Sequence, residues 1–334
     1  MILICLGADT PPNADALYEQ ADILFTARQF EQAGALYRKA LEADPRHWKS
    51  LCRLGQIHAV AGRNGEAEEA LKVAVAINPA DGACQSRLAQ VLLVQKKLAE
   101  AEAPLTKAAQ LMPRDEGVLY NLAKLYESTD RPDLAAETYM KYVDVAPAGA
   151  RVTSIRLKVA RHFAEINQPA KAIEHFRLFL EAQPAIEVRA ELAAALMGAS
   201  QFAESLEEYD KVIAAGAADA KVMANAGAIC MLLQNTPRAV ELLEKAVAAD
   251  PKPTPPRISL AMVLSRSGDD GRAIDVLRGV IADDPENNRA YFLMGQSLMK
   301  LGRADEARAA FDHHRSIHER IMKQRMSFPA ESRP

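Results

Sequence analysis

Prolines recur along this 334-residue chain at a fixed interval. Successive prolines stand 34 residues apart in two runs: Pro45, Pro79, Pro113 and Pro147, then Pro251 and Pro285. Pro184 follows Pro147 after 37 residues, and Ala217 stands where the next proline would fall. A fixed period of about 20 to 50 residues is typical of stacked structural repeats, so the spacing predicts a solenoid rather than one large core.

Two tracks of small residues keep the same period. The first is made only of glycine and alanine: Ala21, Gly55, Ala89, Ala123, Ala160, Ala193, Gly227, Ala261 and Gly295. The second follows twelve residues later: Ala33, Ala67, Ala101, Ala135, Ala172, Ser205, Ala239, Ala273 and Ala307. Small residues allow helix backbones to approach closely, and larger residues recur at helical spacing around them. Each repeat is therefore predicted to be a pair of antiparallel helices.

The pattern resembles the tetratricopeptide repeat. In the second repeat Leu54-Gly55, Ala67, Leu71, Ala74 and Pro79 match the family's order of leucine-glycine, alanine, leucine or aromatic, alanine and closing proline. The resemblance covers about residues 13 to 319 and implies an all-α, right-handed α–α superhelix of about nine helix pairs. It also implies peptide or subunit binding along a concave groove lined by the first helices.

The repeats set the expected domain limits. A short segment, 1–12, precedes the solenoid at 13–319, and 320–334 is expected to be an extension of the last helix followed by a disordered tail. The fifth repeat carries about three extra residues near Ala148 to Val152, where we expect the stack to bend. The expected repeats are 13–45, 46–79, 80–113, 114–147, 148–184, 185–217, 218–251, 252–285 and 286–319.

Composition argues against several function classes. A net charge of −3 and a pI near 6.2 do not suggest a nucleic-acid binder. No apolar run approaches the roughly 20 residues of a membrane span, and the first residues lack the features of a signal peptide. We therefore expect a cytoplasmic protein.

Motifs of catalysis and cofactor binding are missing from the sequence. It has no phosphate-binding glycine loop and no nucleophile-elbow motif, so we expect no enzyme activity and no cofactor. Its four cysteines, Cys5, Cys52, Cys84 and Cys230, are scattered without zinc-ligand spacing. We expect no metal site or disulfide, and interpret the last three as small buried hydrophobic residues in a reducing compartment.

The family's groove positions carry a basic stretch in repeats two to five. Transferring those positions to this chain gives the candidate partner-binding residues: Lys49, Arg53, Arg87, Tyr120, Asn121, Lys124, Lys158 and Arg161. The stretch predicts an adaptor that binds acidic groups of a partner protein or peptide. The alternative is a solvated face with locally paired cations, since Lys124 can reach Glu127 and Arg161 can reach Glu165.

Repeats eight and nine present apolar residues at the same positions. Leu260, Leu264, Met294 and Leu298 already fill the predicted core positions, so a further set is predicted to form an exposed secondary patch: Ile258, Met262, Phe292 and Leu293. This patch and an acidic first repeat (Asp15, Glu19, Asp22) could pair between copies as a dimer or filament. A regulatory or targeting subunit of an enzyme complex is the remaining alternative.

Overall fold

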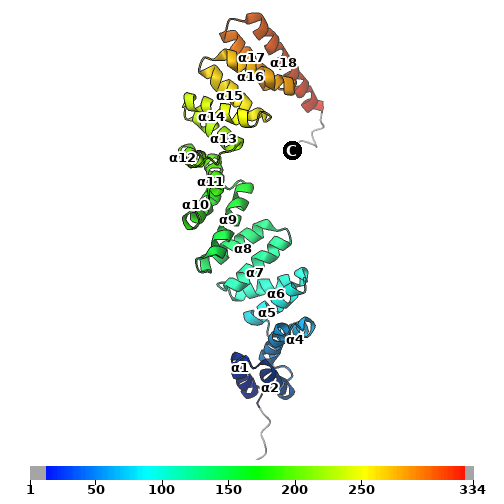
Figure 1. Ribbon diagram of the computed structural model, residues 1–334. Helices are drawn as coiled ribbons and strands as arrows, with labels where there is room; N and C mark the ends of the chain where they lie inside the picture. The colour runs from blue at the N-terminus through cyan, green and yellow to red at the C-terminus, as the bar shows by residue number, and fades with distance from the viewer. Residues whose placement is uncertain (1–12, 328–334) are drawn as a thin grey trace, which may run out of the picture. The chain divides into compact units, whose positions relative to one another are not determined.

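The computed structural model describes residues 13–327, with side chains to residue 323, and every regular element in that range is an α-helix (Figure 1). The chain divides into two compact units, 1–162 and 163–334. Eighteen helices lie in the described range, consistent with about nine helix pairs. The predicted all-α fold class is confirmed.

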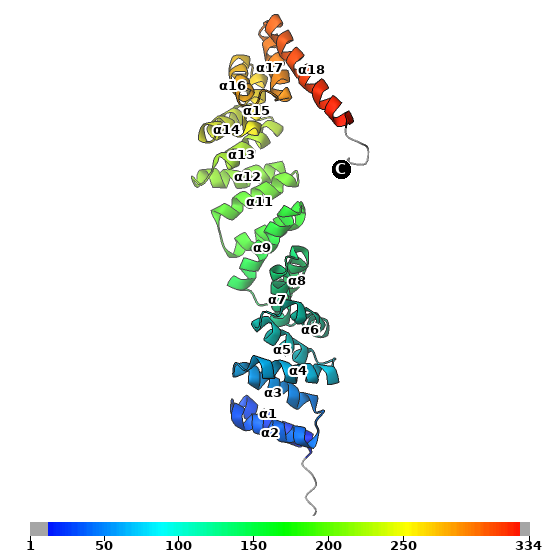
Figure 2. The same cartoon turned by 90° about the vertical axis from the view of Figure 1, so that its right-hand side faces the viewer.

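The first unit contains α1 to α8 and most of α9. Helices that follow each other in the chain pack as antiparallel pairs, and each pair packs on the next (Figure 2). The bounds are α1 (Ala14–Thr26), α2 (Phe30–Ala43), α3 (Trp48–Val60), α4 (Asn64–Ile77), α5 (Gly82–Val94), α6 (Leu98–Leu111), α7 (Glu116–Ser128), α8 (Pro132–Val145) and α9 (Ala150–Glu165).

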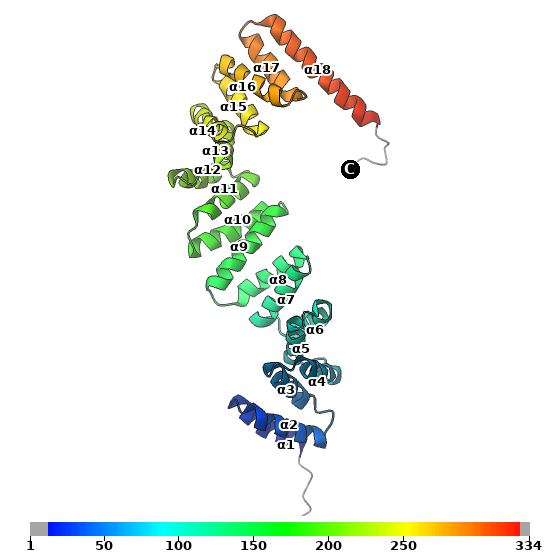
Figure 3. The ribbon, with the colours of Figure 1, turned by 45° about the vertical axis from the view of Figure 1, so that its right-hand side comes forward.

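The second unit begins near the end of α9 and is built in the same way. Its last helix, α18, has 24 residues and extends past its partner α17, which has 13 (Figure 3). The bounds are α10 (Pro169–Ala182), α11 (Ile186–Gly198), α12 (Phe202–Ala214), α13 (Ala220–Leu232), α14 (Thr236–Ala249), α15 (Thr254–Arg266), α16 (Asp270–Asp283), α17 (Asn288–Lys300) and α18 (Ala304–Ser327).

The two helices of a pair are joined by a turn with a left-handed residue. Such a residue ends the first helix because its neighbours' N–H groups then reach the last free carbonyls, as in the Lys97 N–H to Leu92 oxygen bond of 2.9 Å. Three of these residues are glycine, Gly62, Gly268 and Gly302, and six are not: Arg28, Lys96, Asp130, Asn167, Ser200 and Gln234. The second helices end two residues before the periodic prolines, as α4 ends at Ile77 before Pro79.

The small-residue tracks lie where the paired helices approach most closely. Ala21, Ala89 and Ala193 are fully buried, and so are Ala33 and Ala67 of the second track. A Cβ added at Gly227 would come within 2.7 Å of Leu243, and one added at Gly295 within 2.7 Å of Phe311. These contacts confirm that small residues are needed at the two glycine positions, because side chains of the partner helix fill the space beside them.

The extra residues of the fifth repeat lengthen its first helix. Helix α9 has 16 residues, whereas α3 and the other first helices have 13. Tyr142 and Phe179, at the position that Ala40, Ala74 and Ala108 hold in the first three repeats, are both buried. Among the described residues no helix combines the length and apolar character needed to cross a bilayer.

Candidate peptide-binding groove

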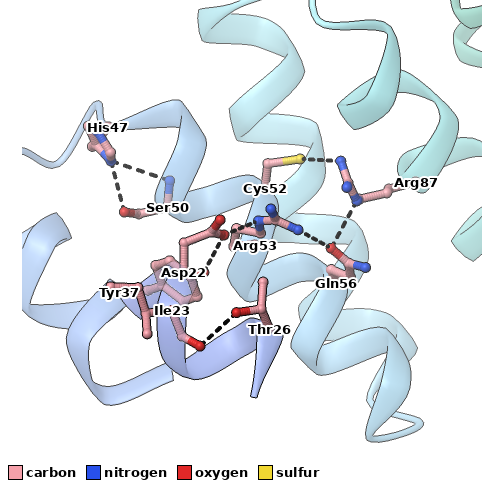
Figure 4. A network of polar contacts seen from close by, with 10 residues as sticks. All are labelled: Asp22, Ile23, Thr26, Tyr37, His47, Ser50, Cys52, Arg53, Gln56 and Arg87. Atoms are coloured by element: carbon pink, nitrogen blue, oxygen red, sulfur yellow. Dashed lines mark hydrogen bonds and ion pairs between the residues drawn. The ribbon is translucent and has the colours of Figure 1, made fainter. Parts of the chain in front are cut away.

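A chain of polar contacts joins the first helices of the first three repeats (Figure 4). Arg53 of α3 forms an ion pair with Asp22 of α1, with 2.8 Å between Nε and Oδ1. The Oε1 atom of Gln56 accepts from Arg53 Nη1 at 3.2 Å and from Arg87 Nε, on α5, at 3.0 Å. Arg87 Nη1 also lies 3.6 Å from the sulfur of Cys52.

Arg53 is held in place from several sides. Its guanidinium lies over the ring of Phe25, 4.6 Å from the centroid. Tyr37 donates a hydrogen bond to Asp22 at 3.1 Å, and burial together with the charge of Asp22 raises the pKa of Tyr37. The phenol of Tyr37 therefore stays a hydrogen-bond donor at neutral pH and orients the Asp22 carboxylate that pairs with Arg53.

The predicted lysines are also paired with acids. Lys49 Nζ lies 3.6 Å from Asp15 Oδ1. Glu127 forms ion pairs with the other two predicted lysines, at 2.7 Å from Lys124 and 2.5 Å from Lys158. Burial alone would raise the pKa of Glu127, but the hydrogen bonds from these two lysines hold it at about 2. The contact of Lys124 with Glu127 confirms the local-pairing alternative at that position.

The remaining predicted residues of repeats four and five are Tyr120, Asn121 and Arg161. Tyr120 packs its ring against Tyr139 and Tyr142. Asn121 is half-buried, and Arg161 is exposed near the end of α9 with a contact of its own. The eight candidates therefore do not form one basic surface: Arg53 and Arg87 share the polar chain of Figure 4, while Lys124 and Lys158 share Glu127.

A pocket of about 650 Å³ opens beside Arg87. Helices α3 and α5 supply most of its lining, and the turn between α6 and α7 adds Met112 and Asp115. Its polar lining residues are Gln56, Asn64, Ser86, Arg87, Gln90 and Asp115. Its apolar lining includes Val60 and Val94, which are 65% and 68% exposed. The carboxylate of Asp115 is engaged as the cap of α7, where it accepts from the backbone N–H of Val118. A pocket that combines one cation, this capping carboxylate, amide groups and exposed valines suits a short peptide segment.

Arg87 differs from the other predicted basic residues in its partners. Its hydrogen bonds go to the neutral Gln56 and to the Cys52 sulfur. Among the side chains described, residues 13–323, no carboxylate forms an ion pair with it. Arg87 is thus the predicted groove residue that keeps its charge available for a ligand.

The exposed valines did not enter the predicted site. Val60 and Val94 each stand five residues after a first-track residue, Gly55 and Ala89. This shared spacing could have pointed to the pair from the sequence. A valine on a helix is, however, interpreted as a core residue until its exposure is known.

The predicted apolar patch of repeats eight and nine is wrong at Ile258. This residue is 5% exposed and packs in the same core as Leu260. The reason is that first helices also contact each other directly, as α13 and α15 do, which buries positions on the groove side. Met262 and Leu293 are partly buried against that core, and of the four residues only Phe292, at 39%, is exposed.

Family comparisons agree with the helix-pair pattern. A model of the tetratricopeptide repeat matches residues 18–82, 52–116 and 190–252, and a second model with that description matches 117–148. Together they cover more than half of the chain. It belongs to the tetratricopeptide-repeat family. A third model, described as subunit 3 of the anaphase-promoting complex, or cyclosome, matches 233–314. The fold of this family is typical of protein-interaction scaffolds.

Solved structures of similar fold are numerous, although no curated protein matches the chain. MamA is 23% identical and covers 50% of this chain and 90% of its own, with a TM-score of 0.42. YrrB, described as having an unusual peptide-binding site, is 20% identical over 57% of this chain and 96% of its own, with a TM-score of 0.42. The structure of Naa15 and Naa10 bound to HypK-THB is 13% identical, and the match covers 93% of this chain and 52% of its own. Its TM-score is 0.52. These likenesses concern the fold alone.

Proposed function

We propose that this tetratricopeptide-repeat protein is a non-catalytic adaptor whose pocket between α3 and α5 binds an acidic segment of a partner protein. The observation that carries the proposal is Arg87. It lines the pocket without a carboxylate partner among the described side chains, while Val60 and Val94 stand exposed beside it. The site is smaller than the basic stretch of repeats two to five that the sequence suggested.

The chemistry of the pocket defines the ligand. Arg87 already donates from Nε to Gln56 and from Nη1 to Cys52, so its Nη2 group is the donor left for a charge-assisted hydrogen bond to a carboxylate. Gln56, Gln90 and Ser86 can hydrogen-bond the peptide backbone, and the two valines can cover an apolar side chain. The expected motif is an acidic residue or a C-terminal carboxylate next to an apolar residue.

The ion pairs elsewhere support this restriction. A peptide carboxylate at Lys124 or Lys158 would have to displace Glu127, which both lysines already share. At Arg53 it would have to displace Asp22. Replacing a paired acid gains little in free energy, whereas Arg87 needs no such exchange.

A peptide selection tests the proposal. A library displayed with free C-termini is selected on the wild-type protein and counter-selected on Arg87→Gln, with Arg46→Gln as control. Arg46 is exposed in the turn before α3 and does not line the pocket. We expect acidic and apolar residues to be enriched in peptides that bind wild type and Arg46→Gln but not Arg87→Gln. Peptides that bind all three proteins equally would contradict the proposal.

Self-association stays a weaker alternative. Asp15 and Asp22, which were to supply an acidic surface for a second copy, are engaged with Lys49 and Arg53 of their own unit. Ile258, which was to supply the apolar one, is in the core. Sedimentation at micromolar concentration decides the matter: a monomer rules out a dimer or filament, and a larger species supports one.

A further inference from the structure

Two cysteines and an aspartate meet beside the pocket. The sulfur atoms of Cys52 and Cys84 and a carboxylate oxygen of Asp81 all lie within 4.8 Å of one another. Cys52 is on α3 and Cys84 on α5, so adjacent repeats contribute to the group. The cysteines are 32 residues apart in the sequence, which hides them from any search for closely spaced ligands.

The three side chains are held in place by the fold. Cys52 is 4% exposed and Cys84 fully buried, whereas Asp81 is partly exposed and gives access from solvent. Asp81 caps α5: its Oδ1 accepts from the backbone N–H of Cys84 at 2.6 Å. This hydrogen bond fixes the orientation of the carboxylate, one oxygen of which lies near both sulfur atoms.

The spacing suits metal coordination. Thiolates bound to zinc at about 2.3 Å in a tetrahedron stand about 3.8 Å apart, within the separation found here. A disulfide would need the sulfur atoms at about 2.05 Å with a defined torsion. Coordination therefore requires less movement of α3 and α5 than a covalent bond would.

The charges also fit a divalent ion. Two thiolates and a carboxylate carry three negative charges, so a bound divalent cation leaves one uncompensated. Arg87, whose Nη1 lies 3.6 Å from the Cys52 sulfur, supplies the balancing positive charge and a hydrogen bond to a ligand atom. Soft thiolate ligands favour zinc-like ions over magnesium or calcium.

We propose that Cys52, Cys84 and Asp81 bind one thiophilic divalent cation of the zinc class, with a fourth position open to water. The ion joins α3 to α5 at the pocket that Arg87 lines, and so ties repeat two to repeat three. This site shares Arg87 with the proposed peptide pocket but has its own ligands, so metal binding is tested without any peptide.

Cobalt and zinc titrations of the reduced full-length protein test the site. Co²⁺ is added until thiolate-to-cobalt charge-transfer absorption saturates, and Zn²⁺ is then used to displace it. We expect one ion per chain and a rise in Tm with Zn²⁺. Cys52→Ala or Cys84→Ala should weaken Zn²⁺ binding by more than about 100-fold, since even second-shell changes cost 10- to 100-fold.

Two matched variants sharpen the result. Asp81→Asn keeps an oxygen that can cap α5 but loses the charge, so it should weaken binding by about 10- to 100-fold. Cys230→Ala removes a buried cysteine of the other unit and should leave binding unchanged. Far-UV circular dichroism of each metal-free variant shows that it is folded.

Two results would overturn the proposal. One is Zn²⁺ binding by the Cys52→Ala/Cys84→Ala double variant equal to that of wild type. The other is a reduced wild-type protein that takes up no ion but loses two hydrogen atoms of mass in air, a loss that Cys52→Ala abolishes, because this would assign the pair to disulfide formation instead.

Discussion

Leu71 of α4 occupies the space beside Gly55 of α3: a Cβ added at Gly55 would lie 2.5 Å from Leu71 Cγ. Both residues belong to the repeat pattern, and Leu71 is fully buried. The contact sets how closely the two helices of the second repeat pack.

Gly55→Ala should lower the free energy of unfolding by about 1 to 2 kcal/mol, because overpacking costs more than the helix propensity of alanine returns. Gly65→Ala is the matched control. Gly65 lies in the first turn of α4 with no atom within 4 Å of an added Cβ, so this change should be neutral or raise stability by up to about 1 kcal/mol. Urea unfolding of both variants checks the difference, and equal effects would contradict it.

The left-handed Lys96 offers a stabilising change. It has φ 61° at the end of α5, is exposed, and stands where three other repeats have glycine. Lys96→Gly should raise the free energy of unfolding by about 0.5 to 1 kcal/mol, since glycine has no Cβ penalty there. Lys96→Ala keeps that penalty and should change little. If both raise stability alike, backbone strain is not the cause.

Glu68 should make the first unit sensitive to acid. Hydrogen bonds from Lys72 and Lys97, at 2.6 and 2.7 Å, lower the pKa of this buried carboxylate from 4.5 to about 2. Its folded-state pKa is depressed, so its contribution is complete above pH 4.5 and is lost as the pH falls towards 2.

Glu68→Gln should therefore lower the free energy of unfolding at pH 7 by about 1 to 3 kcal/mol, and the difference from wild type should shrink between pH 4.5 and 2. Glu241→Gln, which breaks an exposed pair with Lys245, should leave stability nearly unchanged. Thermal unfolding across this pH range provides the measurement. A constant difference between Glu68→Gln and wild type would exclude the carboxylate as its source.

The sequence predicts the repeat architecture because its signals are local and repeated. Gly55, Ala67 and Pro79 each report a contact or helix end within one repeat, and the structure places them so. The site depends on contacts between repeats. Glu127 pairs with Lys158 across 31 positions, and Cys52 meets Cys84 across 32, distances at which a single sequence carries no pairing signal.

The paired lysines should contribute little to ligand binding. Lys124→Gln and Lys158→Gln should change the affinity of a selected acidic peptide by less than about threefold, since each lysine already shares Glu127 and exposed charges are screened by salt. Fluorescence anisotropy at two salt concentrations gives the affinities. If either variant lost as much peptide affinity as Arg87→Gln, the binding site would have to include the whole basic stretch of repeats two to five.

A double-mutant cycle between Arg87 and the peptide tests the central claim most directly. Arg87→Gln is combined with replacement of the peptide's acidic residue by its amide, and the four affinities are measured by anisotropy titration. If the guanidinium contacts that carboxylate, the two changes should be non-additive with a coupling free energy of about 1 to 3 kcal/mol. Additive effects would show that the peptide's acid binds elsewhere and would contradict the proposed site.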